Sequence, residues 1–168
     1  VADFGFSDAR CHQEPVFFYN YSTGNSLNFW EFDDQGSSLT ENPAFTFAAG
    51  EYAVKLRVQN IANCTDSITQ NVVVHELPEI TMGNDTTICP DAEGAITASG
   101  DGHVIRWSPS AGLDDPSSFS PQANPDTNTL YTATITDTLT GCSNSGDLWV
   151  LLQEGFIEGM ITVHPVDT

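Results

Sequence analysis

Residues 50–58 read Gly-Glu-Tyr-Ala-Val-Lys-Leu-Arg-Val, and within them apolar side chains alternate with small or charged ones. Successive side chains of an extended chain point to opposite faces, so Tyr52, Val54, Leu56 and Val58 share one face. This period of two predicts a strand that is buried on one side only. Residues 131–136, Tyr-Thr-Ala-Thr-Ile-Thr, repeat the pattern with threonine on the outer face.

The rest of the chain is also typical of strands. Turn-forming clusters rich in Gly, Asn, Asp and Ser separate short runs of β-branched and aromatic residues. No window shows a sustained helical period with helix caps. We therefore predict an all-β protein with a β-sandwich in each half. Further strands are expected at residues 17–21, 27–32, 44–47, 67–74, 95–98, 104–107 and 148–152.

An internal repeat supports two domains of similar build. The spacing from Cys11 to Cys64 is 53 residues, and the spacing from Cys89 to Cys142 is also 53. Trp30 and Trp107 recur at nearly the same offset. We expect one domain over residues 1–76, a second over 77–153, and a tail, or the first strand of a following domain, over 154–168. The short link at 75–78 contains Pro78 and is expected to be stiff.

The cysteines point to disulfides. Their number is even, and no two stand in a Cys-x-x-Cys pair of the kind that zinc sites use. The repeat predicts the pairs Cys11–Cys64 and Cys89–Cys142, with free thiols as the alternative. Disulfides persist in oxidising compartments, so we expect an extracellular or cell-surface location.

The charge balance excludes some partners. The chain has 23 Asp and Glu against 4 Lys and Arg, a formal net charge of −19. Nucleic-acid binding depends mainly on Lys and Arg, and anionic lipid repels an acidic surface. We expect neither a nucleic-acid partner nor insertion into a membrane.

Two stretches carry a family resemblance. Residues 30–36, Trp-Glu-Phe-Asp-Asp-Gln-Gly, with 42–45, 50–58 and 63–66, resemble a polycystic-kidney-disease (PKD) domain over residues 3–74. Asp33 replaces a usual glycine of that family, and Phe45 and Phe47 replace its usual His and Tyr. Residues 78–152 resemble the immunoglobulin-like module found beside PKD domains. The resemblance implies a secreted protein of Bacteroidota, such as a surface adhesin, a gliding-motility protein or cargo of type IX secretion.

Only weak signals for chemistry are present. Asp33-Asp34 and Asp114-Asp115 stand in turns, where carboxylates could bind Ca²⁺ or simply stabilise the turn by hydrogen bonds. Asp33 and Asp34 are the better calcium candidates, and we expect no other cofactor. No catalytic motif is found, and we do not expect an enzyme.

Modification and contact sites can also be proposed. Asn20, Asn63 and Asn84 fit the N-linked glycosylation signal. Ser67, Thr86 and Thr138 fit the O-linked Asp-Ser/Thr-apolar motif that the resemblance implies. Trp149 and Leu151 share the face opposite to Leu148 and Val150, and with Phe156 of the tail they are candidate contact residues.

These features predict a non-catalytic structural or adhesive segment of a large secreted or cell-surface protein. Its expected partners are neighbouring domains of the same chain, with identical subunits or surface glycans and proteins as further candidates. One alternative is a subunit or segment of an extracellular filament, in which the tail adds a strand to a neighbour. Another is an accessory module of a secreted enzyme that binds carbohydrate or protein.

Overall fold

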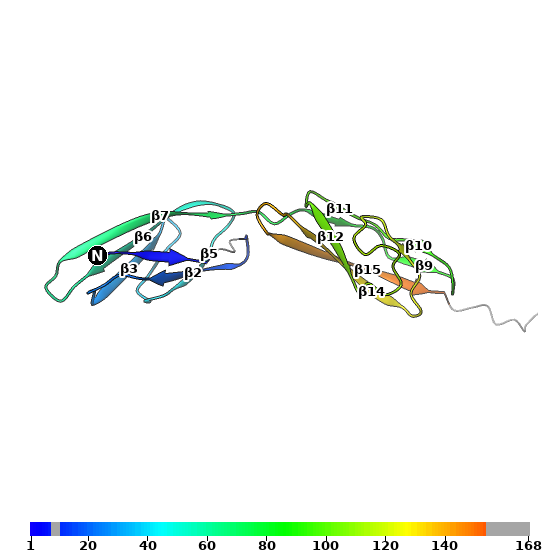
Figure 1. Ribbon diagram of the computed structural model, residues 1–168, viewed down its shortest axis with the longest axis horizontal. Helices are drawn as coiled ribbons and strands as arrows, with labels where there is room; N and C mark the ends of the chain where they lie inside the picture. Colours follow the sequence, from blue (N-terminus) through cyan, green and yellow to red (C-terminus); the bar gives the residue numbers. More distant parts are fainter. Residues whose placement is uncertain (8–10, 154–168) are drawn as a thin grey trace, which may run out of the picture. The chain divides into compact units, whose positions relative to one another are not determined.

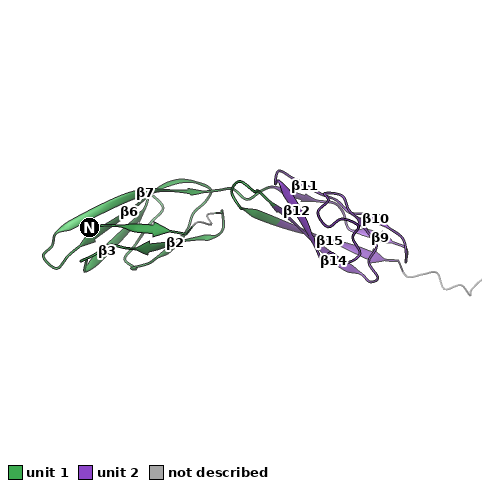
Figure 2. Ribbon diagram, in the orientation of Figure 1, with its two compact units in different colours: residues 1–78, 136–144 green, residues 79–135, 145–168 purple. Residues whose placement is uncertain are grey.

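The computed structural model describes residues 1–7 and 11–153, and every regular element in these ranges is a β-strand (Figure 1). The all-β prediction is confirmed. The chain divides into two compact units (Figure 2). Unit 1 contains residues 1–78 and 136–144, and unit 2 contains residues 79–135 and 145–168. The described residues contain no helix of the length and apolarity needed to cross a membrane.

Unit 1 contains a three-stranded and a four-stranded sheet. The first has the order β1-β2-β5 and the second the order β4-β3-β6-β7. β6 and β7 pair antiparallel from Gly50 opposite Val74 to Gln59 opposite Thr65. The strands are β1 (Phe4–Phe6), β2 (Pro15–Asn20), β3 (Leu27–Phe32), β4 (Ser37–Ser38), β5 (Ala44–Thr46), β6 (Gly50–Gln59) and β7 (Thr65–Val74).

Unit 2 contains a four-stranded sheet of order β12-β14-β15-β9 and two small pairs, β11-β8 and β10-β13. β9 runs parallel to the end of β15, with Ile88 opposite Leu152. The strands are β8 (Ile80–Met82), β9 (Thr86–Ile88), β10 (Gly94–Ala95), β11 (Ala98–Gly100), β12 (Val104–Ser108), β13 (Gln122–Ala123), β14 (Thr129–Thr136) and β15 (Ser143–Leu152).

Each unit has its own hydrophobic core. In unit 1, Val54, Leu56 and Val58 are buried, as the alternation in β6 predicts, and aromatic rings fill the space around them. Trp30 is fully buried, and its ring meets that of Phe4 edge to face at 5.0 Å. The other core members include Phe18, Phe32 and Phe47.

The core of unit 2 is more aliphatic, and the polar atoms of its large buried rings have hydrogen-bond partners. Trp107 donates from Nε1 to the carbonyl of Ser118 at 2.9 Å, and the Tyr131 hydroxyl donates to the carbonyl of Ala111 at 2.8 Å. Burial raises the pKa of the Tyr131 phenol. Ile96, Ile105 and Leu148 are among the side chains packed around these rings.

Candidate functional site

The disulfide of this chain joins Cys11 to Cys142, with 5.6 Å between their Cα atoms. The predicted pairs Cys11–Cys64 and Cys89–Cys142 are therefore wrong. Cys142 lies in the turn between β14 and β15, and residues 136–144 around that turn belong to unit 1. Both sulfur-bearing residues are buried, at 6 % and 0 % exposure.

Strand geometry explains the error. Cys11 forms an isolated parallel bridge with His75, directly after the end of β7, whereas Cys64 directly precedes the start of β7. A strand rises about 3.3 Å per residue, so eleven residues separate these two points by about 36 Å. A disulfide requires Cα atoms within about 7 Å. Equal spacing in a repeat identifies equivalent cysteines without showing that they bond to each other.

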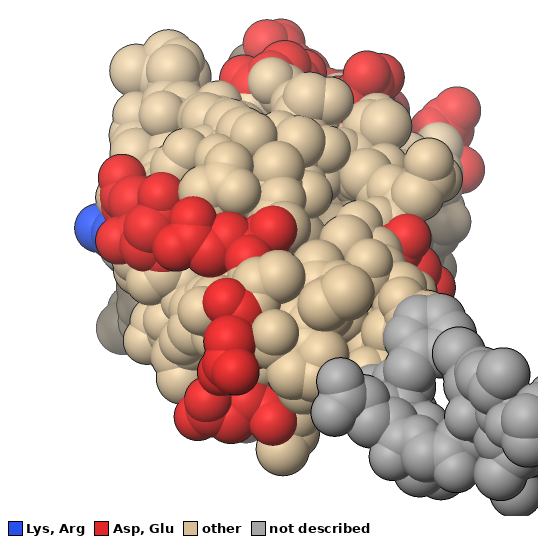
Figure 3. Space-filling view, turned by 90° about the vertical axis from the view of Figure 1, so that its right-hand side faces the viewer, with Lys and Arg blue, Asp and Glu red and all other residues tan. Residues whose placement is uncertain are grey.

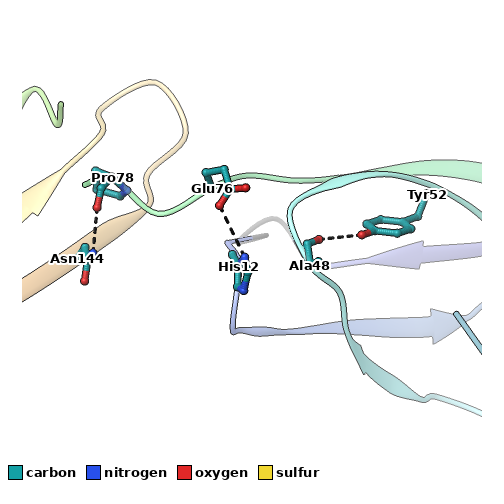
Figure 4. A network of polar contacts seen from close by, with 6 residues as sticks. All are labelled: His12, Ala48, Tyr52, Glu76, Pro78 and Asn144. Carbon is teal, nitrogen blue, oxygen red and sulfur yellow. Dashed lines mark hydrogen bonds and ion pairs between the residues drawn. The ribbon is translucent and has the colours of Figure 1, made fainter. Parts of the chain in front are cut away.

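Polar contacts join the chain segments that hold His12, Glu76, Pro78 and Asn144, which are close in sequence to the bonded cysteines or to the end of β7 (Figure 4). The backbone N–H of His12 donates to the carbonyl of His75 at 2.8 Å, and the His12 ring lies 3.7 Å from a carboxylate oxygen of Glu76. On the other side, the amide of Asn144 donates to the carbonyl of Pro78 at 3.0 Å. We call the disulfide together with these contacts the 11–142 link.

The remaining cysteines, Cys64 and Cys89, are exposed and unbonded. Cys64 ends the turn between β6 and β7, and Cys89 directly follows β9. Both therefore lie at ends of strands where a second chain segment could reach them.

The candidate calcium residues lie in the turn after β3. Asp33 has a left-handed backbone with a φ of 52°, and Asp34 accepts a hydrogen bond from Gln35. Within residues 1–7 and 11–153, no group of three or more His, Cys, Asp or Glu side chains is placed to hold a metal ion. The rival pair stabilises its own loop, because Asp114 accepts from Gln122 and Asp115 from Ser117. Calcium binding at Asp33 and Asp34 stays a prediction.

The candidate glycosylation residues differ in surroundings. Asn63, Asn84, Ser67 and Thr138 are exposed, whereas Asn20 and Thr86 are half-buried. Asn20 accepts a hydrogen bond from the backbone of Ser22. Glycosylation of these residues stays a prediction.

Trp149 and Leu151 lie on the outer face of β15, with 41 % and 37 % exposure, while Leu148 and Val150 are buried. The backbone N–H of Trp149 donates to Asp85 at 2.8 Å. The third candidate contact residue, Phe156, lies outside the described residues.

A row of exposed aromatic side chains on unit 1 was not predicted. Phe17 and Tyr19 alternate with buried neighbours along β2, Tyr21 continues the row, and their exposures are 48 %, 42 % and 60 %. Tyr19 pairs across the sheet with Gly5, and the ring of Tyr21 reaches 3.0 Å from the place where a Cβ of Gly5 would stand. We call Phe17, Tyr19 and Tyr21 the aromatic row. The alternation in residues 17–21 places these three rings on one face of a strand, but Phe18 on the other face is also aromatic, so the pattern does not show which face is exposed.

A second surface feature of unit 1 is a hollow of about 680 Å³, lined mainly by residues of β3 and β6. The guanidinium of Arg57 stands 5.3 Å from the centre of the Phe29 ring there. Leu27 and Leu39, also in the lining, are largely exposed. The hollow combines apolar walls with one of the few cations of the chain.

Most other charged groups are acidic, and they dominate the charged surface of the face drawn in Figure 3. Hydrogen bonds from the backbone of Ala2 and then Ser67 lower the pKa of Asp66. The hydroxyl and then the backbone of Ser117 lower the pKa of Asp115. These carboxylates stabilise local structure as anions.

Comparison with known proteins identifies similar solved structures but no family. No family model matches the chain, and no curated protein sequence matches it. A PKD1 domain of Vibrio anguillarum Epp is 23 % identical over 45 % of this chain and 93 % of its own, with a TM-score of 0.40. A PKD1 domain of the Vibrio cholerae metalloprotease PrtV is 25 % identical over 44 % and 93 %, with a TM-score of 0.37. Fibronectin(III)-like modules of Clostridium thermocellum CbhA are 12 % identical over 90 % and 94 %, with a TM-score of 0.42.

Proposed function

We propose that this chain is a non-catalytic structural and adhesive segment of a large secreted or cell-surface protein. The observation that carries the proposal is the 11–142 link, a buried disulfide that closes a loop of 131 residues. On the chain-entropy account, such a loop stabilises the folded state by about 5 kcal/mol. A bond of this kind is useful where thiols are oxidised and where a protein must resist unfolding.

The charge and the surface support the same proposal. A net charge of −19 keeps copies apart in solution and limits nonspecific association. Adhesins and type IX secreted proteins, which the sequence resembles, are the kind of parent protein that we infer.

The location can be tested in the source cells. One sample of intact cells is treated with a membrane-impermeant alkylating reagent, and a separate sample is treated with an external protease. We expect the protease to degrade the chain, and in the alkylated sample we expect Cys11 and Cys142 to resist alkylation until reduction. Recovery of an intact chain with four reduced thiols would contradict the proposal.

The aromatic row favours a second function, binding of carbohydrate. Exposed rings along one strand offer apolar faces on which sugar rings stack, and Gly5 leaves the strand beside them without a side chain. A glycan array with the wild-type chain tests this function. We expect Tyr19→Ala to lose at least tenfold in affinity for any bound glycan, while Ile61→Ala, a change at another exposed apolar residue of unit 1, leaves it unchanged.

A further inference from the structure

Cys64 and Cys142 occupy equivalent positions in two similar hairpins. In the first hairpin the backbone N–H of Asn60 donates to the carbonyl of Cys64 at 3.0 Å, and in the second the N–H of Asp137 donates to the carbonyl of Cys142 at 2.9 Å. The side chains of Asn60 and Asp137 both accept from the backbone two residues further on. We call Cys64 and Cys142 the hairpin cysteines.

Cys11 and Cys89 are equivalent in the same way. Each accepts a backbone hydrogen bond at 3.1 Å from the residue three positions later, Glu14 or Ala92. Each of these turns also has a left-handed third residue, Gln13 with a φ of 73° and Asp91 with a φ of 62°. We call Cys11 and Cys89 the strand-end cysteines.

The surroundings of each kind also match. Cys11 lies beside His75 after the end of β7, and Cys89 follows Ile88, whose carbonyl accepts from Gln153 after the end of β15. Each strand-end cysteine therefore lies beside the point where the chain leaves the last strand, in chain order, of its own repeat, β7 or β15.

Each hairpin cysteine lies near the point where the chain enters the first strand of its own repeat, β1 or β8. Two residues after Cys142, Asn144 holds the carbonyl of Pro78, which stands two residues before β8. Two residues after Cys64, Asp66 accepts from the N–H of Ala2, which stands two residues before β1. Each hairpin turn thus holds the residue two positions before the first strand of its own repeat.

We propose that Cys64 and Cys89 are the two complementary halves of a second link like that at 11–142. The observed disulfide joins a strand-end cysteine to the hairpin cysteine of the repeat that follows it. By the same rule, Cys89 bonds to the Cys64 of a second copy of this repeat pair placed after it. The result is a head-to-tail series, because the two bonding surfaces differ and do not close on themselves.

The bond forms by thiol–disulfide exchange with a small-molecule disulfide such as oxidised glutathione. The Cys89 thiol loses its proton and attacks that disulfide, which releases one small thiol and leaves a mixed disulfide on Cys89. The Cys64 thiolate then attacks the mixed disulfide and releases the second small thiol. Two protein thiols are oxidised to one disulfide, and one small disulfide is reduced to two thiols.

A tandem protein tests the proposal. Residues 1–153 are followed by one glutamate, copied from position 76, and then by residues 1–168, so that Gln153 and the next Ala2 stand three positions apart, as His75 and Pro78 do. The first copy carries Cys64→Ser and the second carries Cys89→Ser. Apart from Cys11 and Cys142, the cysteines left are therefore Cys89 of the first copy and Cys64 of the second, which both lie at the junction. The matched control places Cys89→Ser in the first copy and Cys64→Ser in the second.

After oxidation with glutathione, we expect the test protein to have no free thiol and to yield a Cys64–Cys89 peptide on non-reducing mass spectrometry. The control should keep two free thiols, while both proteins form Cys11–Cys142 in each copy. Two free thiols in the test protein, or equal thiol loss in the control, would overturn the proposal. The same chain could still be a structural segment of a surface protein, so failure here leaves the proposed function to its own test.

Discussion

The 11–142 link should remove most of the chain from the path of a mechanical load. When the chain is pulled from its ends, tension passes from residues 1–11 through the disulfide to residues 142–168. The 131-residue interval between Cys11 and Cys142 then carries no tension. Cys142→Ser, or reduction of the wild-type protein, would put that interval back into the load path.

The structure gives the size of the effect. A fully extended chain spans about 3.5 Å per residue, so the hidden interval corresponds to about 460 Å of extension. The disulfide itself replaces this length with a Cα separation of 5.6 Å. We therefore expect Cys142→Ser to unfold to a contour length about 450 Å greater than that of the oxidised wild type.

Optical tweezers with DNA handles at both termini would measure this difference. Cys89→Ser serves as the control, because Cys89 is unbonded and its replacement should leave the contour length unchanged. Equal lengths for the wild type and Cys142→Ser would refute the reasoning. A hidden length of about 190 Å for each of two bonds would instead support the pairs Cys11–Cys64 and Cys89–Cys142, which enclose 53 residues each.

The remaining predictions concern the cores and the charges. The Nε1 atom of Trp30 has no hydrogen-bond partner in the described part of the chain, whereas that of Trp107 has one. Trp107→Phe should therefore destabilise the protein by about 1–3 kcal/mol more than Trp30→Phe in urea unfolding, and equal costs would contradict this. The lowered pKa of Asp66 makes its contribution to stability present above the ordinary pKa of 3.8 and lost as the pH falls through the lower folded value. Asp66→Asn should thus be less stable than wild type at pH 7, and the difference should shrink as the pH falls below 3.8; a difference that stays constant across this range would disprove the assignment. Added salt should raise the melting temperature, because it screens repulsion among 23 acidic residues, and a fall at 0.5 M NaCl would show that ion pairs matter more.

Local patterns in the sequence predicted much of the fold, because a strand with one buried face leaves a clear period of two. Val54, Leu56 and Val58 are buried in β6, and Tyr131, Ala133 and Ile135 are buried in β14. Counted from the hairpin turns, Tyr131 is equivalent to Val54 and not to Tyr52.

The candidate site was less predictable, because it depends on which strand ends come together. Cys11, Cys64, Cys89 and Cys142 were recognised as a repeated set, but their pairing follows from three-dimensional position alone. The aromatic row was missed for a related reason. Residues 17–21 were predicted as a strand, yet only the pairing of β2 with β1 and β5 shows which rings face outward.

Ion pairs are too few among the described residues to offset the repulsion of the acidic surface. Among the described residues, two ion pairs lie within 4 Å, His12 with Glu76 and Lys55 with Glu31, and both are at least partly exposed. Exposed pairs contribute at most about 1 kcal/mol each, while a net charge of −19 opposes compaction. The aromatic core of unit 1 and a disulfide worth about 5 kcal/mol offset that repulsion. The 11–142 link and the buried rings do not depend on charge, so they stabilise the fold of a chain whose surface is acidic enough to resist association.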